Sequence, residues 1–234
     1  MPEAARKVEP WFRRLYLPAY QIVDAARYAQ TKAGTVTYWH YHGGGLGPVF
    51  PDRTRRQPLS YLELVEVAFV ATMRRLGLSL QRIRKARQYV AQTFNSEYPF
   101  AEFRFKTEGM HLLLELENFD KDFKAGTIVA DKGGQLAWEE FMAKRFYEFD
   151  YESVLSNGHS SNLAIRWHVV GRNQPIIIDP RISFGAPIVK GIPTWAIRGR
   201  YRAGEEIEEI QEEFGLAPDD IRHALEFEGE KIAA

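Results

Sequence analysis

The segment SYLELVEVAFVATMRRLG, residues 60–77, constrains the fold of this chain more than any other part of the sequence. Ser60 and Glu63 have the spacing of a capping box, in which the hydroxyl and the carboxylate each accept a hydrogen bond from a backbone amide at the start of a helix. Apolar residues then recur every three or four positions, and Gly77 can adopt the left-handed conformation that ends a helix. We therefore expect a helix over residues 61–76.

A second helix is expected directly afterwards, because Ser79 can cap the segment QRIRKARQYVAQTF. The spacing of its residues predicts an apolar inner face and a basic outer face. The inner face carries Ile83, Ala86 and Val90, and the outer face carries Arg82, Arg84, Lys85 and Arg87.

Two shorter helical patterns precede this pair, within residues 18–42, and a polar break separates them. The spacing is that of a helix-turn-helix unit. The first pattern offers an apolar face of Ile22, Val23, Ala26 and Tyr28, and the second begins one with Val36, Trp39 and His40. The following residues, 43–58, are rich in glycine and proline and predict an extended loop or hairpin. This segment holds Arg53, Arg55 and Arg56 and resembles a basic wing.

Charge divides the sequence into two halves whose net charges cancel. Residues 1–100 carry 15 Lys and Arg against 7 Asp and Glu, whereas residues 101–234 carry 16 against 24. A basic N-terminal half suits a polyanion, and an acidic C-terminal half suits a basic protein partner or pairing between the halves. The alternative for the basic half is an ordinary solvated surface.

The absence of cysteine excludes disulfides, thiol nucleophiles and thiolate metal sites, and it fits a reducing compartment. The best candidate for a membrane segment, residues 62–73, contains Glu63 and Glu66 and falls short of the roughly 20 apolar residues that cross a bilayer. The N-terminus lacks the apolar region of a signal peptide. We expect a cytoplasmic protein without a membrane segment.

The pattern changes to short alternating or β-branched runs over residues 95–178, which predict a small antiparallel sheet. The strand candidates are AEFRFKT, HLLLELE, TIVAD, LAIRWHVVG and PIIID, with turns at Gly133-Gly134 and Ser156-Asn157-Gly158. Residues 179–202 then predict an extended β-arm, shaped by Gly185, Pro187, Gly191 and Pro193, that could pair with a partner strand.

The chain is expected to become helical again after residue 203, in two short helices that form a second helix-turn-helix-like unit. Glu205 and Glu206 favour the positive end of the first helix, and Gly215 ends it. Pro218 suits the first position of the second helix. The buried stripes should consist of Ile207, Ile210 and Phe214 in the first helix and Ile221, Ala224 and Leu225 in the second.

No constellation of residues in the sequence predicts catalysis. The six histidines form no helical pair with an intervening glutamate, so we expect no metal site and no cofactor. Ser156 to Ser160 has the composition of a turn, and Gly43-Gly44-Gly45 precedes no predicted helix that could hold a phosphate. We therefore expect a binding protein with no catalytic residues.

Two resemblances add to this interpretation. The stretches Tyr20 to Ala26 and Gly34 to Trp39, followed by RRLGLSLQRIRKA, resemble the winged helix-turn-helix of MerR-like DNA-binding proteins. Residues 179–210 and their continuation to LEFE are similar to the domain-of-unknown-function family 433, found in antitoxins of bacterial toxin-antitoxin systems. Chains that join both modules through a segment like YPFAEFRFKTEG, residues 98–109, resemble VapB-type antitoxins.

The resemblance implies a cytoplasmic antitoxin that silences a toxin with a PIN-type ribonuclease fold and represses its own operon by binding operator DNA. The expected DNA-binding residues are Thr35, Thr37, Tyr38, Arg53, Arg55, Arg56, Arg82, Arg84 and Lys85. In this chain Thr37 and Tyr38 stand where such recognition helices commonly carry arginines, and Tyr38 and Trp39 could equally serve packing.

The same resemblance suggests that a basic side chain of the antitoxin blocks the carboxylate cluster of the toxin. Arg198, Arg200 and Arg202 are the candidates, because a guanidinium pairs well with carboxylates. A homodimer is expected, since helix-turn-helix proteins usually bind paired half-sites. The alternative function is a MerR-like, ligand-responsive transcription regulator whose central sheet senses a small molecule.

The sequence thus predicts an α+β chain in three parts. These are a winged helix-turn-helix domain over residues 1–94, a β-rich region over 95–174, and an antitoxin module over 175–234 in which the β-arm precedes the helices. Which helix-turn-helix unit contacts DNA, and which surface closes the dimer, stays open at this stage.

Overall fold

The computed structural model describes residues 10–42, 47–50, 54, 56–75, 77–102, 147–156 and 159–232, with the backbone alone at 155, 156 and 159–161. The fold separates into two compact units. The N-terminal unit extends to Tyr147 and includes Tyr151–Ala164, and the C-terminal unit consists of Glu148–Asp150 and Ile165–Ala234.

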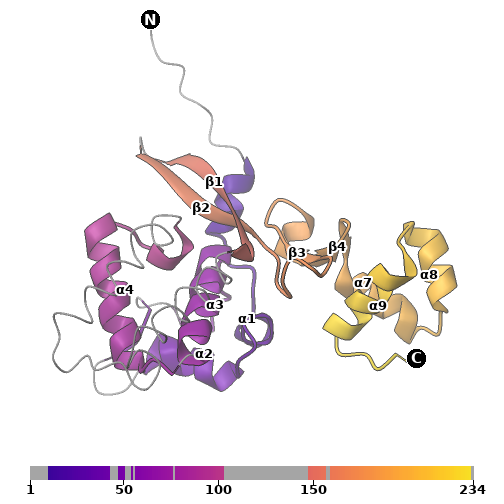
Figure 1. The fold of residues 1–234 in the computed structure, drawn as a ribbon, viewed down its shortest axis with the longest axis horizontal. Coiled ribbons are helices and arrows are strands. Elements are labelled where there is room, and N and C mark those ends of the chain that lie inside the picture. The colour runs from indigo at the N-terminus through magenta and orange to yellow at the C-terminus, as the bar shows by residue number, and fades with distance from the viewer. Residues whose placement is uncertain are drawn as a thin grey trace, which may run out of the picture. The chain divides into compact units, whose positions relative to one another are not determined.

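Helices make up most of the described N-terminal unit (Figure 1). They are η1 (Pro10–Leu15), α1 (Ile22–Tyr28), α2 (Ala33–Tyr41), α3 (Tyr61–Arg75), α4 (Leu80–Phe94) and η2 (Pro99–Ala101). The predicted capping box starts α3: the Ser60 amide donates to Glu63 Oε2 at 2.6 Å, and the Glu63 amide donates to Ser60 Oγ at 3.2 Å. Gly77, at φ +87°, follows the helix as predicted.

Helix α3 is the centre of this unit, since its side chains from Tyr61 to Met73 are buried with the exception of Glu63. Helix α4 is capped by Ser79 Oγ, which accepts from the Arg82 amide at 3.3 Å, and it buries Ile83, Ala86 and Val90 as predicted. The prediction that Arg87 faces outward is wrong. Its side chain is buried because it pairs with Glu66 of α3.

The strands form one sheet in the order β1-β2-β3-β4-β5, and the chain passes from one unit to the other within β1 and β2. Their bounds are β1 (Phe149–Ser156), β2 (His159–Trp167), β3 (Ile176–Ile178), β4 (Pro187–Val189) and β5 (Ile192–Pro193). The pairs β2-β3, β3-β4 and β4-β5 are antiparallel. The predicted α+β class is confirmed, and β2 and β3 lie where LAIRW and PIIID predict strands.

The predicted β-arm is correct only in its β-structure, since β4 and β5 lie within residues 187–193 but pair inside the unit's own sheet, and residues 194–202 are helical. Three of these residues form η4 (Ser183–Gly185), and β4 and β5 follow as a hairpin. Helix α7 (Thr194–Arg202) then begins where the arm was expected to continue. The chain adopts this structure because β4 pairs with β3 along its whole length, with Ile177 opposite Ile188.

Helices α8 (Ile207–Phe214) and α9 (Pro218–Phe227) complete the C-terminal unit and lie where they were predicted. Gly215 ends α8 at φ +65°, and Pro218 occupies the first turn of α9. The core combines apolar side chains of the sheet and of all three helices. It includes Trp167, Ile176, Ile178, Ile188, Val189, Ile197, Ile210, Ile221, Ala224 and Leu225.

Several predictions lie outside the described residues. These are the strands within residues 103–131 and the turn at 133–134. The three-part division of the chain stays a prediction for the same reason. Over the part of the chain that the structure describes, no helix has the length and apolarity needed to cross a membrane.

Candidate functional site

In the segment where a helix-turn-helix unit is expected, four residues separate α1 from α2 in the N-terminal unit. The two helices pack through buried side chains, among them Ala26 of α1 and Val36 and Trp39 of α2. The Thr31 amide donates to the Ala26 carbonyl at 2.8 Å and fixes the turn. The prediction that Val23 belongs to the apolar face of the first helix is wrong, because its side chain is 67% exposed.

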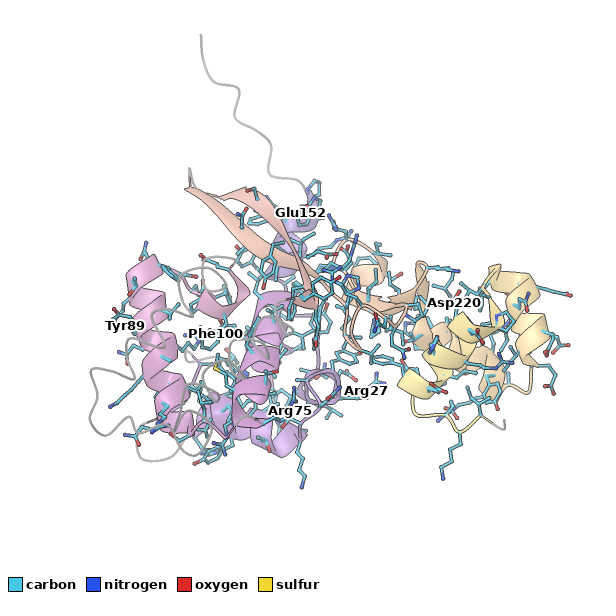
Figure 2. The ribbon with its side chains drawn as sticks, viewed as in Figure 1. Arg27, Arg75, Tyr89, Phe100, Glu152 and Asp220 are labelled. Carbon is cyan, nitrogen blue, oxygen red and sulfur yellow. The ribbon has the colours of Figure 1, made fainter. Side chains whose placement is uncertain are left out.

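Helix α3 also holds α1 in place. Arg75 extends its guanidinium back to the end of α1, where Nη1 donates to the Ala29 carbonyl at 2.8 Å (Figure 2). Arg27 is exposed on α1 and lies 4.9 Å from the ring centroid of Tyr28, in a cation-π contact. The outer surface of α1 therefore presents one cation and one exposed apolar side chain, Val23, four residues apart.

The three residues expected on the recognition helix have different environments. Tyr38 is 41% exposed, and its ring stacks on His42 with centroids 6.1 Å apart. Thr35 is half-buried. The Thr37 hydroxyl donates to the Ala33 carbonyl at 3.0 Å, so its proton is used within the helix. Tyr38 is the best presented of the three, whereas Trp39 is 1% exposed and serves packing.

The expected cations of the wing and of α4 are only partly described. Arg56 is exposed and has a left-handed φ of +67°, while Arg53 and Arg55 lie outside the described residues. On α4, Lys85 is exposed and Arg82 is half-buried. Arg84 Nε donates to the Pro48 carbonyl at 3.1 Å.

The segment Pro48–Phe50 links α2 to α4. The Val49 amide donates to the Trp39 carbonyl at 2.8 Å, next to the residue that holds Arg84. The structure thus brings Arg84 close to the C-terminal end of α2. A pocket of about 730 Å³ lies along the same segment and α4, and its polar lining includes Arg84, Gln88 and Gln92.

All three arginines suggested for toxin contact lie on α7, and each pairs with a carboxylate of the C-terminal unit. Arg198 Nη1 lies 2.9 Å from Glu228 Oε2, and Arg202 Nε lies 2.6 Å from Glu230 Oε1. Arg200 pairs with Glu205 at 2.8 Å and also with Glu213. These pairs join α7 to α8 and to the end of α9, so the arginines have a structural role whatever their role in partner binding.

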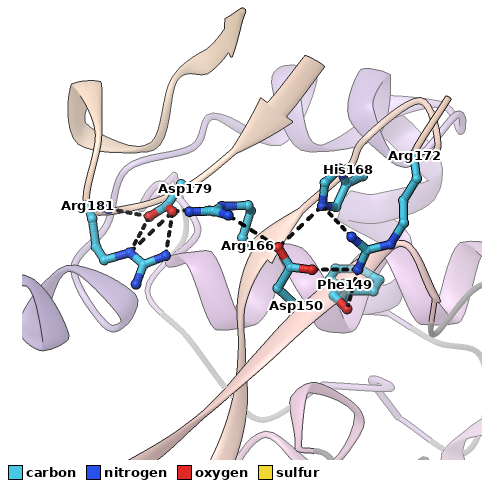
Figure 3. A network of polar contacts seen from close by, with 7 residues as sticks. All are labelled: Phe149, Asp150, Arg166, His168, Arg172, Asp179 and Arg181. Carbon is cyan, nitrogen blue, oxygen red and sulfur yellow. Dashed lines mark hydrogen bonds and ion pairs between the residues drawn. The ribbon is translucent and has the colours of Figure 1, made fainter. Parts of the chain in front are cut away.

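Sequence reasoning did not foresee a polar network that joins β1, β2 and β3 of the C-terminal unit (Figure 3). Asp179, at the end of β3, is fully buried, and its carboxylate accepts from Arg181 Nη2 at 2.7 Å and from Arg166 Nε at 3.1 Å. Although burial acts to raise the pKa of Asp179, the hydrogen bonds from Arg181 and Arg166 lower it below its ordinary value.

The other end of the network is centred on Asp150. Its carboxylate accepts from Arg172 Nη2 at 2.5 Å and lies 3.3 Å from His168 Nε2. Arg166 joins the two carboxylates, since its Nη1 lies 3.4 Å from Asp150 Oδ2. Burial acts to raise the pKa of Asp150, but hydrogen bonds from Arg172 and His168 lower it.

His168 lies between the charged groups of this network. Its Nε2 atom lies 3.0 Å from Arg172 Nη1 and 3.3 Å from Asp150 Oδ2, so it faces a guanidinium and a carboxylate. Burial lowers the pKa of His168, and the charge of Arg172 acts in the same direction. Because the network's carboxylates are occupied by guanidinium groups, it is best explained as a structural clamp.

Within the described ranges, no group of three or more histidines and carboxylates could hold a metal ion. The two surfaces with candidate functions are therefore the helix-turn-helix face of the N-terminal unit and the helical part of the C-terminal unit.

Comparison with known proteins gives three results. Residues 176–227 match a family described as "Protein of unknown function (DUF433)". The chain is 22% identical over 236 residues to a Mycobacterium tuberculosis protein named "Putative antitoxin VapB45", and the match covers 91% of this chain and 95% of that protein. The X-ray crystal structure of Rv2018 from Mycobacterium tuberculosis is similar with a TM-score of 0.67 at 20% identity, covering 91% and 99% of the two chains.

Proposed function

We propose that this chain is the antitoxin of a toxin-antitoxin pair. It binds and neutralises a PIN-type ribonuclease toxin through its C-terminal unit, and it represses its own operon by binding promoter DNA through α1 and α2. The observation that carries the proposal is the similarity to a protein named as an antitoxin over nearly the full length of both chains. The match of residues 176–227 to family 433 supports it. In this proposal the chain itself catalyses no reaction.

The helix-turn-helix face supports the DNA-binding part of the proposal. Tyr38 of α2 and His42, which directly follows that helix, are both exposed and stack on each other, and a phenol and an imidazole can both bond to base edges or phosphates. The positive charge near this face comes from Arg27 and Lys32, with Lys85 further along the unit. A homodimer would place two copies of α2 in successive turns of the major groove.

Replacing Tyr38 by alanine is expected to weaken binding to promoter DNA about 10- to 100-fold, because one base-reading contact is worth roughly 1–3 kcal/mol. Replacing Lys85 by glutamine should instead weaken binding to all sequences and reduce the salt slope by about one phosphate contact. Electrophoretic mobility shift at several salt concentrations measures both effects. Tyr147→Ala, which removes another exposed aromatic side chain, is the matched control. Absence of a wild-type complex at low salt would refute DNA binding.

The toxin-binding part is tested by co-expression with the product of the neighbouring gene. We expect the two proteins to co-purify and the ribonuclease activity of the neighbour to fall to background in the complex. A neighbour that is active in the presence of excess antitoxin would contradict the proposal. The triple variant R198A/R200A/R202A tests the arginines, with circular dichroism to detect loss of the fold, since each side chain also holds a carboxylate.

A ligand-responsive regulator is the second candidate, and the pocket along α4 favours it. Its polar lining suits a small hydrophilic molecule. The pocket lies beside Pro48–Phe50, which contacts α2 through Val49, so a bound ligand would act close to the proposed DNA-binding helix. A small molecule that raises the melting temperature and changes DNA affinity would favour this function over the first.

A further inference from the structure

The C-terminal unit exposes two large aromatic side chains, Phe184 and Trp195. Phe184 is 79% exposed and Trp195 is 58% exposed. An aromatic side chain can bury 150–250 Å², so leaving it in water forfeits a large share of the stabilisation available to it. Tryptophan is also the residue type most enriched at the centres of protein interfaces.

The backbone around Phe184 adds a second cost. Ser183 and Phe184 have φ values of +47° and +53°, in the left-handed region that a residue with a bulky side chain rarely adopts. Such conformations cluster at functional sites, where the surrounding structure maintains them. Here the strained turn leaves the Phe184 side chain 79% exposed and returns little burial to the fold.

Phe184 and Trp195 lie on neighbouring segments of the C-terminal unit. The Thr194 Oγ1 atom lies 3.3 Å from the Pro187 carbonyl oxygen, which places the start of α7 beside the start of β4. Trp195 follows Thr194 directly, and Phe184 precedes Pro187 by three residues, a distance of at most about 10 Å along the chain. We call this pair, Phe184 and Trp195, the aromatic corner.

Helix α7 leaves room beside the aromatic corner. Gly199 lies one turn after Trp195 on the same exposed side, and a Cβ atom placed on it would meet nothing within 4 Å. A glycine inside a helix costs roughly 0.5–1 kcal/mol relative to alanine, and packing within this unit does not require one here. The absence of a side chain leaves a shallow surface next to the Trp195 ring, on which a partner can lie close to the helix backbone.

The charge of the unit identifies the chemistry of that partner. Residues 176–232 hold 7 Lys and Arg against 12 Asp and Glu. Arg181, Lys190, Arg198, Arg200, Arg202 and Arg222 are all paired with carboxylates of the unit, such as Asp220 for Lys190. The excess charge is therefore carried by exposed glutamates of α8 and α9, including Glu208, Glu212 and Glu226.

Glu208 and Glu212 are four residues apart on α8, so they repel each other and destabilise the helix that carries them. A basic partner would relieve this repulsion, and the same field would accelerate its association. A second copy of this acidic surface would instead be repelled. Charge complementarity thus favours a basic protein over self-association through this face.

From these observations we infer that the aromatic corner anchors a basic protein partner, whose apolar pocket receives Trp195 and Phe184 and whose Lys and Arg residues face the glutamates of α8 and α9. The inference rests on the proposed function, in which the C-terminal unit holds the toxin, and it specifies the surface and the chemistry of that contact. The arginines of α7 then support the anchor from behind by fixing the helix to the unit.

The test measures the affinity of the full chain for the purified product of the neighbouring gene, by calorimetric titration. Trp195→Ala and Phe184→Asn should each weaken the complex about 30-fold, the effect expected of an interface hot spot. Asparagine tolerates the left-handed conformation, so the melting temperature of Phe184→Asn should stay equal to that of the wild type or increase by roughly 2 °C. This opposite response of stability and binding distinguishes an anchor from a structural residue.

Val170→Ala is the matched control, because Val170 is an exposed apolar residue of the same unit, and its complex should have wild-type affinity. The double variant E208Q/E212Q should slow association and flatten its dependence on salt. If the wild-type complex forms and both aromatic variants bind as tightly as the wild type, the anchor is refuted while the antitoxin proposal stands. If the wild-type chain does not bind, the proposed function itself fails. If Trp195→Ala dissociates a homodimer and leaves toxin binding intact, the occupant is a second copy and the inference is wrong.

Discussion

Replacing Arg87 by methionine should destabilise the N-terminal unit by about 3–5 kcal/mol, because it leaves the Glu66 carboxylate charged and unpaired in the core. Glu66 is 1% exposed, its Oε2 lies 2.5 Å from Arg87 Nε, and its Oε1 accepts from the Phe100 amide at 2.7 Å. Arg87 also donates to the Glu97 carbonyl at 2.6 Å, so the pair holds α3, α4 and η2 together. Hydrogen exchange measured by mass spectrometry should show the loss of protection in peptides of this unit.

The dependence of this effect on pH has a defined sign. Burial raises the pKa of Glu66, and the Arg87 guanidinium opposes that change. Without Arg87 the folded-state pKa of Glu66 rises further. Below the pKa of the unfolded chain the carboxyl is protonated in both states and costs no stability, and the loss of stability grows as the pH rises from there through the folded-state pKa. R87M should therefore be least destabilised in acid.

The double variant E66L/R87M is the control for R87M. Removing both charges avoids an unpaired buried ion, so much of the lost stability should return, with a residual cost for the unpaired amide of Phe100. A single variant R87M as stable as the wild type at neutral pH would show that the pair has no such role.

The same pair shows what could and could not be predicted from the sequence. Helices α3 and α4 were predictable because their caps and apolar spacing are local signals, and Ser60, Glu63 and Ser79 act as expected. Arg87 was assigned outward because it is charged, although it follows Ile83 by four residues and therefore shares its face. A charge at an inner position of each of two consecutive helices was the available signal for the buried pair.

Helix α7 was missed for a different reason. Arg198, Arg200 and Arg202 alternate with a period of two, and the surrounding prolines and glycines favour an extended chain. What stabilises the helix lies far along the sequence: Glu228 receives both Arg198 and the Thr194 hydroxyl, and Glu230 receives Arg202. Local patterns contain no information on such pairings, so the segment was assigned to an arm.

The candidate sites, too, could be predicted only where local sequence patterns determine them. Tyr38 could be proposed from its place in a local helix-turn-helix pattern, and its exposure agrees with that proposal. The network of Figure 3 could not be proposed, because Asp150, Arg166 and Asp179 are 16 and 13 residues apart and meet only through sheet pairing. The aromatic corner depends on exposure and on φ values, which the sequence does not specify.

Replacing Asp179 by alanine should destabilise the C-terminal unit by about 3 kcal/mol, the second large effect that we expect. Its carboxylate is fully buried and holds the side chains of Arg166 and Arg181 together with the Arg181 amide at 2.9 Å. Both arginines are 25–34% exposed at their side chains and can regain some hydration, which is why the expected loss is smaller than for R87M. Urea denaturation measures this loss of stability, and it is followed by the near-ultraviolet signal of the buried Trp167, which lies on β2 of the same unit.

The pH dependence of Asp179 should be opposite to that of R87M. The folded-state pKa of Asp179 is lowered from its ordinary value of 3.8, so its stabilisation is fully present above that value and is lost as pH falls through the folded-state pKa. Asp150 responds in the same direction, and so does His168, whose lowered pKa makes protonation unfavourable in the folded chain. The wild-type unit should therefore lose stability in acid, and D179N should show a shallower acid limb from a lower starting stability.

D219N, which removes an 83% exposed carboxylate paired with Arg222 on α9, should change stability by less than about 0.5 kcal/mol and leave the acid limb unchanged. An acid limb equally steep in D179N and the wild type would mean that the clamp does not control this unit's response to pH.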